Sequence, residues 1–355
     1  MENFFTSETN FLNKVEEFTQ NTEWVTANIS DSKVTESEME LVVKTEKGDY
    51  PLTVSGKASL PARAGLSGSV LSELTSKDYQ QVLNTCFPYK SGNMLLNVYE
   101  GSVYAAHSDN YAVLEVNEIF QTANKKLKQM FPTASFLWGS ISPDFAMAEY
   151  SLANEKSVVE IYEQAFSEFF SKNEEIVAPT IRVVTSNTSE SGANVYPCFL
   201  RRGSNGENYS ILAGEPIKLN HKGDANIEKF EENLAGSFSL IQKTAENIIK
   251  LTYLRIEHPV SCFLNICKDL NLPKPASMEL ADEISAILGG PEVKTHAKFL
   301  YLMLTKHLEK ARKSSNKEKF NMACNISRML SLDIQKRDRK FCEWLKGNPN
   351  QISFF

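Results

Sequence analysis

The side chains with the clearest chemical potential in this sequence are cations that lie close to aromatic residues. Arg201 and Arg202 directly follow a segment that contains Tyr196 and Phe199. The other members of this first basic set are Arg182, Lys218, His221 and Lys222. A guanidinium offers planar paired donors to phosphate, and aromatic faces stack on bases. These residue types therefore predict a site for single-stranded nucleic acid, provided that the fold brings them together at one end of a sheet.

A second basic set lies near the end of the chain. Residues 294–346 hold ten lysines and four arginines against five acids, whereas residues 1–50 hold eleven acids and four lysines. The members of the second basic set that we expect to contact phosphate are Arg312, Lys313, Arg337, Arg339 and Lys340. The net charge of −6 argues against a protein that coats duplex DNA through bulk charge. A solvated helix face that keeps the protein soluble is the alternative interpretation.

Catalytic signatures are missing from the sequence. It contains neither GxxxxGK[ST] nor a GxGxxG pattern after a strand, so it gives no support for nucleotide cofactors. The segment Gly65–Ser69 is not GxSxG, and none of the five histidines forms HxH or HExxH. Catalysis needs paired acid–base or nucleophilic groups. The sequence therefore predicts a protein that is not an enzyme and that uses no cofactor.

The six cysteines are typical of reduced, buried thiols. No CxxC occurs, and the spacing of His258, Cys262 and Cys267 fits no zinc pair, so we expect no metal site. No run of about 18 apolar residues is present, which predicts no membrane span. The acidic start MENFFTSETNFLNKVEEF is unlike a signal peptide. We therefore expect a cytoplasmic protein.

The pattern of short alternating segments and periodic helices predicts an α+β fold. Strands arrive as consecutive hairpins, for example around Glu100-Gly101 and around 142–144, so an antiparallel or mixed sheet is favoured. Beyond Gly223 the periodicity becomes helical, with one long helix expected from Leu234 to Thr252. The expected division is an N-terminal helix or arm (1–29), an α+β body (30–222) and an all-helical C-terminal region (223–355).

Apolar side chains occur at both ends of the chain, where polar residues are usual. They are Phe4, Phe5, Trp344, Phe354 and Phe355. Exposed apolar groups of this kind mark contacts with the protein's own body or with another copy. The sequence thus favours a homo-oligomer.

The segment MLLNVYEGSVYAAHSDNYAVLEVNEIF (94–120) resembles the signature of the uncharacterised phage/plasmid-like protein family. In that family a strand ends in an Ala-Val-Ser-x-x-Tyr-like motif before a helix, which corresponds here to 105–111. The segments VVTSNTSESGANVYPCFLRR and IKLNHKGDANIEKFEENL resemble the family's strand–loop and His-containing segments. The resemblance covers about residues 40–260. The chain departs from the family pattern at Tyr104, where arginine is common, and it lacks the family's cysteine motif.

The resemblance implies a phage or mobile-element protein in a bacterial host cell, with links to replication, recombination or counter-defence. Together with the basic sets it predicts a non-enzymatic protein that binds nucleic acid, single-stranded DNA above all. Two alternatives stay open. The first is a counter-defence protein that inhibits a host protein by binding it, and the second is a self-assembling structural protein.

Overall fold

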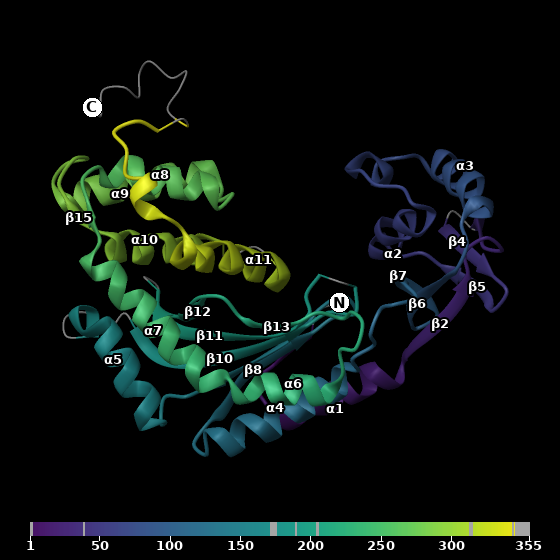
Figure 1. Ribbon diagram of the computed structural model, residues 1–355, viewed down its shortest axis with the longest axis horizontal. Helices are drawn as coiled ribbons and strands as arrows, with labels where there is room; N and C mark the ends of the chain where they lie inside the picture. Colours follow the sequence, from purple (N-terminus) through teal and green to yellow (C-terminus); the bar gives the residue numbers. More distant parts are fainter. Residues whose placement is uncertain are drawn as a thin grey trace.

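The computed structural model describes residues 3–37, 40–170, 176–188, 190–203, 206–311, 315–342 and 344. Helices and antiparallel sheets confirm the predicted α+β fold. The buried apolar side chains form two separate cores. One core belongs to a small lobe made of residues 22–108, and the other belongs to the main body, made of the N-terminal residues up to Gln20 and the described residues from Leu114 onward (Figure 1).

A curled seven-stranded sheet forms the centre of the main body. Its strands are β1 (Asn3–Phe5), β8 (Ser135–Ile141), β9 (Ala146–Ser151), β10 (Ile176–Thr185), β11 (Ala193–Arg202), β12 (Asn208–Leu212) and β13 (Ile217–Leu219). The order is β1-β8-β9-β10-β11-β12, with β13 also paired to β11, and every pair is antiparallel. The strands joined by 142–144 and by 186–192 confirm the predicted hairpins.

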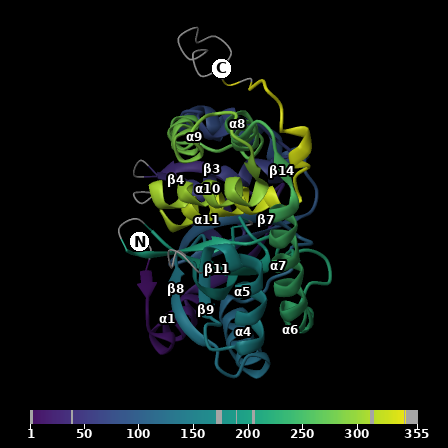
Figure 2. The ribbon, with the colours of Figure 1, turned by 90° about the vertical axis from the view of Figure 1, so that its left-hand side faces the viewer.

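Helices cover both faces of this sheet. The first face carries α1 (Glu8–Gln20), α4 (Val116–Met130), α5 (Lys156–Phe170), α6 (Ile227–Ala235) and α7 (Ser237–Tyr253). The second face carries α10 (Ala297–Lys310) and α11 (Asn316–Ser327), as Figure 2 shows. Phe11 of α1 approaches the sheet closely at Gly139, where a Cβ would lie 2.5 Å from the Phe11 ring. Only glycine allows that approach, because it carries no side chain.

The remaining C-terminal elements complete the main body. They are α8 (Pro259–Asp269), α9 (Lys274–Leu288), the paired β14 (Arg255–Ile256) and β15 (Thr295–His296), and the 3₁₀ turns η4 (Arg328–Ser331) and η5 (Ile334–Lys336). Their apolar residues, such as Phe263, Leu280 and Ile334, join the same core as the sheet. The predicted boundary at 222/223 therefore marks a change in secondary structure and not a separate core.

The small lobe contains two three-stranded sheets. One consists of β2 (Thr22–Asn28), β6 (Asn93–Tyr99) and β7 (Ser102–Ser108), and the other of β3 (Lys33–Ser37), β4 (Glu40–Thr45) and β5 (Gly48–Pro51). Beside them lie α2 (Val54–Ser59), α3 (Ser76–Cys86) and the 3₁₀ turns η1 (Leu60–Ala64), η2 (Ser69–Ser72) and η3 (Phe87–Tyr89). Leu60, Leu96 and Val103 lie at its centre. This core within the predicted body corrects the expected division of residues 30–222.

Two sequence-based expectations differ from the structure in detail. The N-terminal helix begins only after Ser7, which caps it, because residues 3–5 pair with β8 as an edge strand. The long helix expected from Leu234 to Thr252 is interrupted at Gly236, which ends α6 and begins α7. The apolar period continues across this break, so periodicity alone did not reveal it.

Candidate functional site

Arg182 of the first basic set lies inside the main body and not on its surface. It is 6% exposed, and its Nε and Nη2 donate to Glu149 Oε2 at 3.0 and 2.7 Å. The Glu149 carboxylate is fully buried and also accepts from Thr180 and Ser210, at 2.5 and 2.6 Å. Arg182 is therefore one half of a buried ion pair, which corrects its assignment to a nucleic-acid contact.

The neighbours Arg201 and Arg202 point to opposite sides of β11, because successive side chains of a strand alternate between its two faces. Arg201 is 4% exposed, and its Nη1 donates to Leu302 O and Thr305 Oγ1 of α10. Arg202 is exposed. The two guanidinium groups therefore cannot bind the same phosphate.

The other members of the first basic set lie at the far end of β11. Lys218 is opposite Asn194, seven residues from Arg201 along the strand, which is roughly 23 Å at about 3.3 Å per residue. Lys218 pairs with Glu215 at 3.2 Å, His221 is buried, and Lys222 is exposed. The expectation that this basic set converges at one end of the sheet is therefore wrong.

The second basic set contributes to a surface pocket of about 490 Å³ in the C-terminal region. Four cations line it, namely Lys268 at the end of α8, Lys336 and Arg337 around η5, and Arg339 beyond them. Asp269 is the one carboxylate among its described lining residues, and Phe341 adds an aromatic ring that is 55% exposed. We call this feature the basic pocket.

The chain segment that carries these cations is firmly attached to α8. Asp338 accepts from the backbone N–H groups of Glu257 and His258 at 2.7 and 2.8 Å. Asn265 Nδ2 donates to the carbonyls of Arg337 and Phe341 at 3.1 and 3.2 Å. Because these bonds fix the backbone on both sides of Arg339, the basic pocket is formed before any ligand binds.

Several cations around the basic pocket already have acidic neighbours. Arg337 Nε lies 2.8 Å from Asp269, and Lys336 Nζ lies 2.9 Å from Asp333. Lys340 is 3.9 Å from Glu292. Exposed ion pairs are worth only about 0–1 kcal/mol, so a phosphate can replace such a partner at little cost. Arg312 and Lys313 lie outside the described residues.

A column of stacked rings joins the small lobe to the main body. His107 of β7 stacks on Tyr111 at 3.8 Å between centroids, and Tyr111 stacks on His221 at 5.1 Å. His107 Nε2 donates to Asn187 O at 2.7 Å, and His221 Nδ1 lies 3.2 Å from Ala112 O. Residues from three segments that lie far apart in the sequence meet here. These contacts connect the small lobe to the main body.

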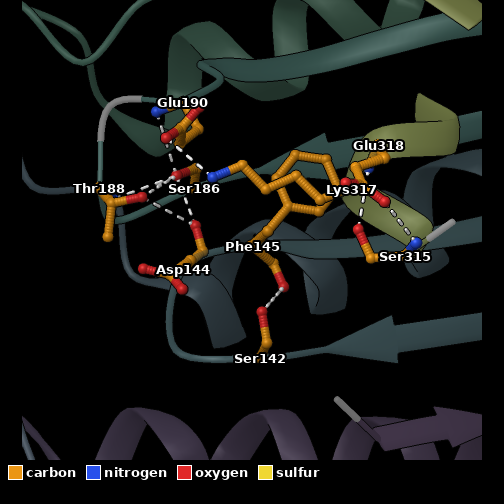
Figure 3. Close-up of polar contacts among 9 residues, drawn as sticks. All are labelled: Ser142, Asp144, Phe145, Ser186, Thr188, Glu190, Ser315, Lys317 and Glu318. Atoms are coloured by element: carbon orange, nitrogen blue, oxygen red, sulfur yellow. Dashed lines mark hydrogen bonds and ion pairs between the residues drawn. The ribbon is translucent and has the colours of Figure 1, made fainter. Parts of the chain in front are cut away.

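The turn between β8 and β9 is joined by hydrogen bonds to the loop that follows β10, and an ion pair joins that loop to α11, as Figure 3 shows. The hydroxyls of Ser186 and Thr188 both donate to Asp144 O, at 2.6 and 3.1 Å. Glu190 pairs with Lys317 of α11 at 2.8 Å. Lys317 therefore holds this loop against α11, and it is not among the lining residues of the basic pocket.

Burial raises the pKa of several cysteine thiols in the main core. All six are free thiols, and burial raises the pKa of Cys267 to about 12 and of Cys324 to about 11. Within the described ranges no group of three or more His, Cys, Asp or Glu could hold a metal ion. None of the helices that the structure describes is both long and apolar enough to cross a membrane.

The terminal apolar residues predicted to mediate oligomer contacts differ in their surroundings. Phe4 stacks on Trp138 at 5.7 Å and is still 58% exposed. Phe5 and Trp344 pack against the main core of the same chain. Phe354 and Phe355 lie outside the described residues. Self-association thus stays a prediction. Among the described terminal apolar residues, Phe4 is the most exposed.

Comparison with known proteins identifies no relative of this chain. No family model matches it, and neither the curated proteins nor the solved structures contain a match.

Proposed function

We propose that the chain is a non-enzymatic nucleic-acid-binding protein of a phage or other mobile element, and that it binds single-stranded DNA at the basic pocket during replication or recombination. The supporting observation is the combination of four cations with the half-exposed ring of Phe341 around one preformed pocket. Cations that follow a backbone and an aromatic face that stacks on a base are the two elements of such sites. The mobile-element context rests on the family resemblance.

The expected affinity is modest and depends on salt. Lys268, Lys336 and Arg339 line the pocket together, so about three phosphates can be neutralised. Counterion release then predicts a slope of log K against log salt of roughly −2 for a single strand. A phosphate leaving this pocket would restore the Lys336–Asp333 pair.

The test is fluorescence anisotropy of a labelled oligothymidine at about 50 and about 200 mM salt. The double variant Lys336→Glu/Arg339→Glu should weaken binding at least tenfold at the lower salt and flatten the slope, because two cations become acids. The matched control is Lys243→Glu/Lys250→Glu, which makes the same charge change at exposed positions on α7. Absence of binding by the wild type, or equal losses in both variants, would contradict the proposal.

Binding of a host protein is the second candidate function, and exposed apolar residues of the small lobe favour it. Val54 of α2 and Tyr89 of η3 are 88% and 86% exposed, and Val70 of η2 is exposed as well. Isolated apolar residues are common on surfaces, whereas contiguous apolar patches mark contact surfaces, and this second candidate requires that the three residues belong to one such patch.

The two candidate functions predict opposite effects of the same variants. If the small lobe binds a host protein, Val54→Glu/Tyr89→Glu should abolish capture of that protein from nuclease-treated bacterial lysate. Lys336→Glu/Arg339→Glu should leave the captured amount unchanged. Quantitative mass spectrometry of the captured proteins measures both effects, and a bound protein that depends on the basic pocket would count against this second candidate.

A further inference from the structure

A second pocket lies between the second face of the main sheet and the C-terminal helices. Its volume is about 410 Å³, within the range of pockets that hold small organic molecules. Strand residues Trp138, Met147 and Leu200 form its floor and one wall. The opposite wall comes from Leu308 of α10 and from α11. We call it the sheet pocket.

Two cations line the sheet pocket, and Glu149, the carboxylate that pairs with one of them, is not among its lining residues. Arg182 is one of the lining residues. Its Nε and Nη2 donate hydrogen bonds to Glu149, and its Nη1 makes no hydrogen bond among the described residues. Lys319 of α11 also lines the sheet pocket, and it has no ion-pair partner in the part of the chain that the structure describes. No Asp or Glu is among the described residues of the lining.

Arg182 is held rigidly in its place. The Glu149 carboxylate fixes two of its nitrogens, and the guanidinium lies 5.0 Å from the Trp138 ring centroid. Phe4 covers the same indole by stacking at 5.7 Å. A buried charge that lines a cavity, is fixed in this way and keeps one nitrogen without a hydrogen bond is suited to be a preorganised anion contact.

We propose that the sheet pocket binds a small amphipathic anion, an aromatic or alkyl body that carries a carboxylate or a phosphate monoester. Arg182 Nη1 and Lys319 Nζ would contact the anionic group, while Met147, Leu308 and Phe320 would surround the apolar body. The sheet pocket and the basic pocket share no lining residue, so this proposal does not depend on nucleic-acid binding.

Isothermal titration calorimetry of the full chain with 2-naphthoate and with 2-naphthyl phosphate tests the proposal. We expect saturable one-to-one binding of at least one of them, and the tighter of the two identifies the preferred anionic group. Lys319→Met should weaken binding about tenfold, because it keeps the apolar stem and removes one charge-assisted contact. Lys317→Met is the matched control, two residues away and paired with Glu190 outside the pocket.

A second variant covers the possibility that Lys319→Met perturbs folding. Ala323→Phe places a ring inside the sheet pocket and should abolish binding of both ligands, with the far-UV circular dichroism spectrum as the check on folding. Saturable binding in the wild type that both variants reduce and Lys317→Met leaves unchanged supports the proposal. No binding of either ligand up to about 1 mM, or binding that survives in both folded variants, overturns it.

Discussion

Replacing Glu149 by glutamine should lower the free energy of unfolding by about 3–5 kcal/mol, the largest single effect on stability that this structure predicts. The carboxylate is fully buried and accepts hydrogen bonds from Arg182, Thr180 and Ser210. The amide of glutamine has the same shape but no charge, so the buried guanidinium of Arg182 would lose its only carboxylate partner among the described residues. Urea denaturation monitored by circular dichroism measures the loss.

A double-mutant cycle separates the charge from the packing. Arg182→Met together with Glu149→Leu should recover part of the lost stability, because apolar residues of similar volume replace a buried pair at low cost. The exposed pair Lys44–Asp49, at 3.1 Å, is the control, and Lys44→Met should change the free energy of unfolding by less than about 1 kcal/mol. A loss below about 1 kcal/mol for Glu149→Gln would show that Arg182 is not held by this charge.

Local sequence patterns predicted much of the fold because most strands form hairpins. The Glu100-Gly101 turn between β6 and β7 and the turn at 142–144 between β8 and β9 join neighbouring strands, so residues close in sequence determine the pairing. Strand β1 was missed, since a three-residue edge strand is defined by its partner β8, more than 130 residues away. No local pattern contains that contact.

The first basic set does not form one site, and part of the reason could have been seen in the sequence. Arg201 and Arg202 are adjacent on one strand, and alternation requires one of them to face each side. The partner of Arg182 could not be predicted in the same way, because Glu149 lies 33 residues away and becomes a neighbour only when β9 pairs with β10. The number of charged residues in a segment can be read from the sequence, whereas the pairing of the strands determines which of those charged side chains are exposed to solvent.

The column of stacked rings is made by residues from three segments that lie far apart in the sequence. His107 and Tyr111 come from one of these segments, Asn187 from the second and His221 from the third, and the structure brings all four together. The sequence could not show that this meeting point joins the small lobe to the main body. That role follows from the two separate cores on either side of the column.

Lowering the pH should reduce the free energy of unfolding, because burial lowers the pKa of several histidines. Burial, with smaller contributions from nearby His221 and Arg63, lowers the pKa of His107 to about 4 despite the opposing effect of the Asn187 carbonyl. Burial also lowers the pKa of His221, and that of His307 in the main core to about 4. An unfolded chain binds these protons near pH 6.5, so between about pH 6.5 and 4 the unfolded state holds more protons and stability falls as the pH falls.

The expected size of this effect is about 1.4 kcal/mol at pH 5.5 for His107 and for His307, and about 3 kcal/mol for each near pH 4. Urea denaturation from pH 7.5 to 4.5 measures it. His107→Gln keeps a donor for Asn187 O but does not titrate, so its stability profile should be flatter than that of the wild type. The exposed His296 gives the control His296→Gln, whose profile should match the wild type. If all three profiles have the same slope, protonation of the ring column does not couple to unfolding.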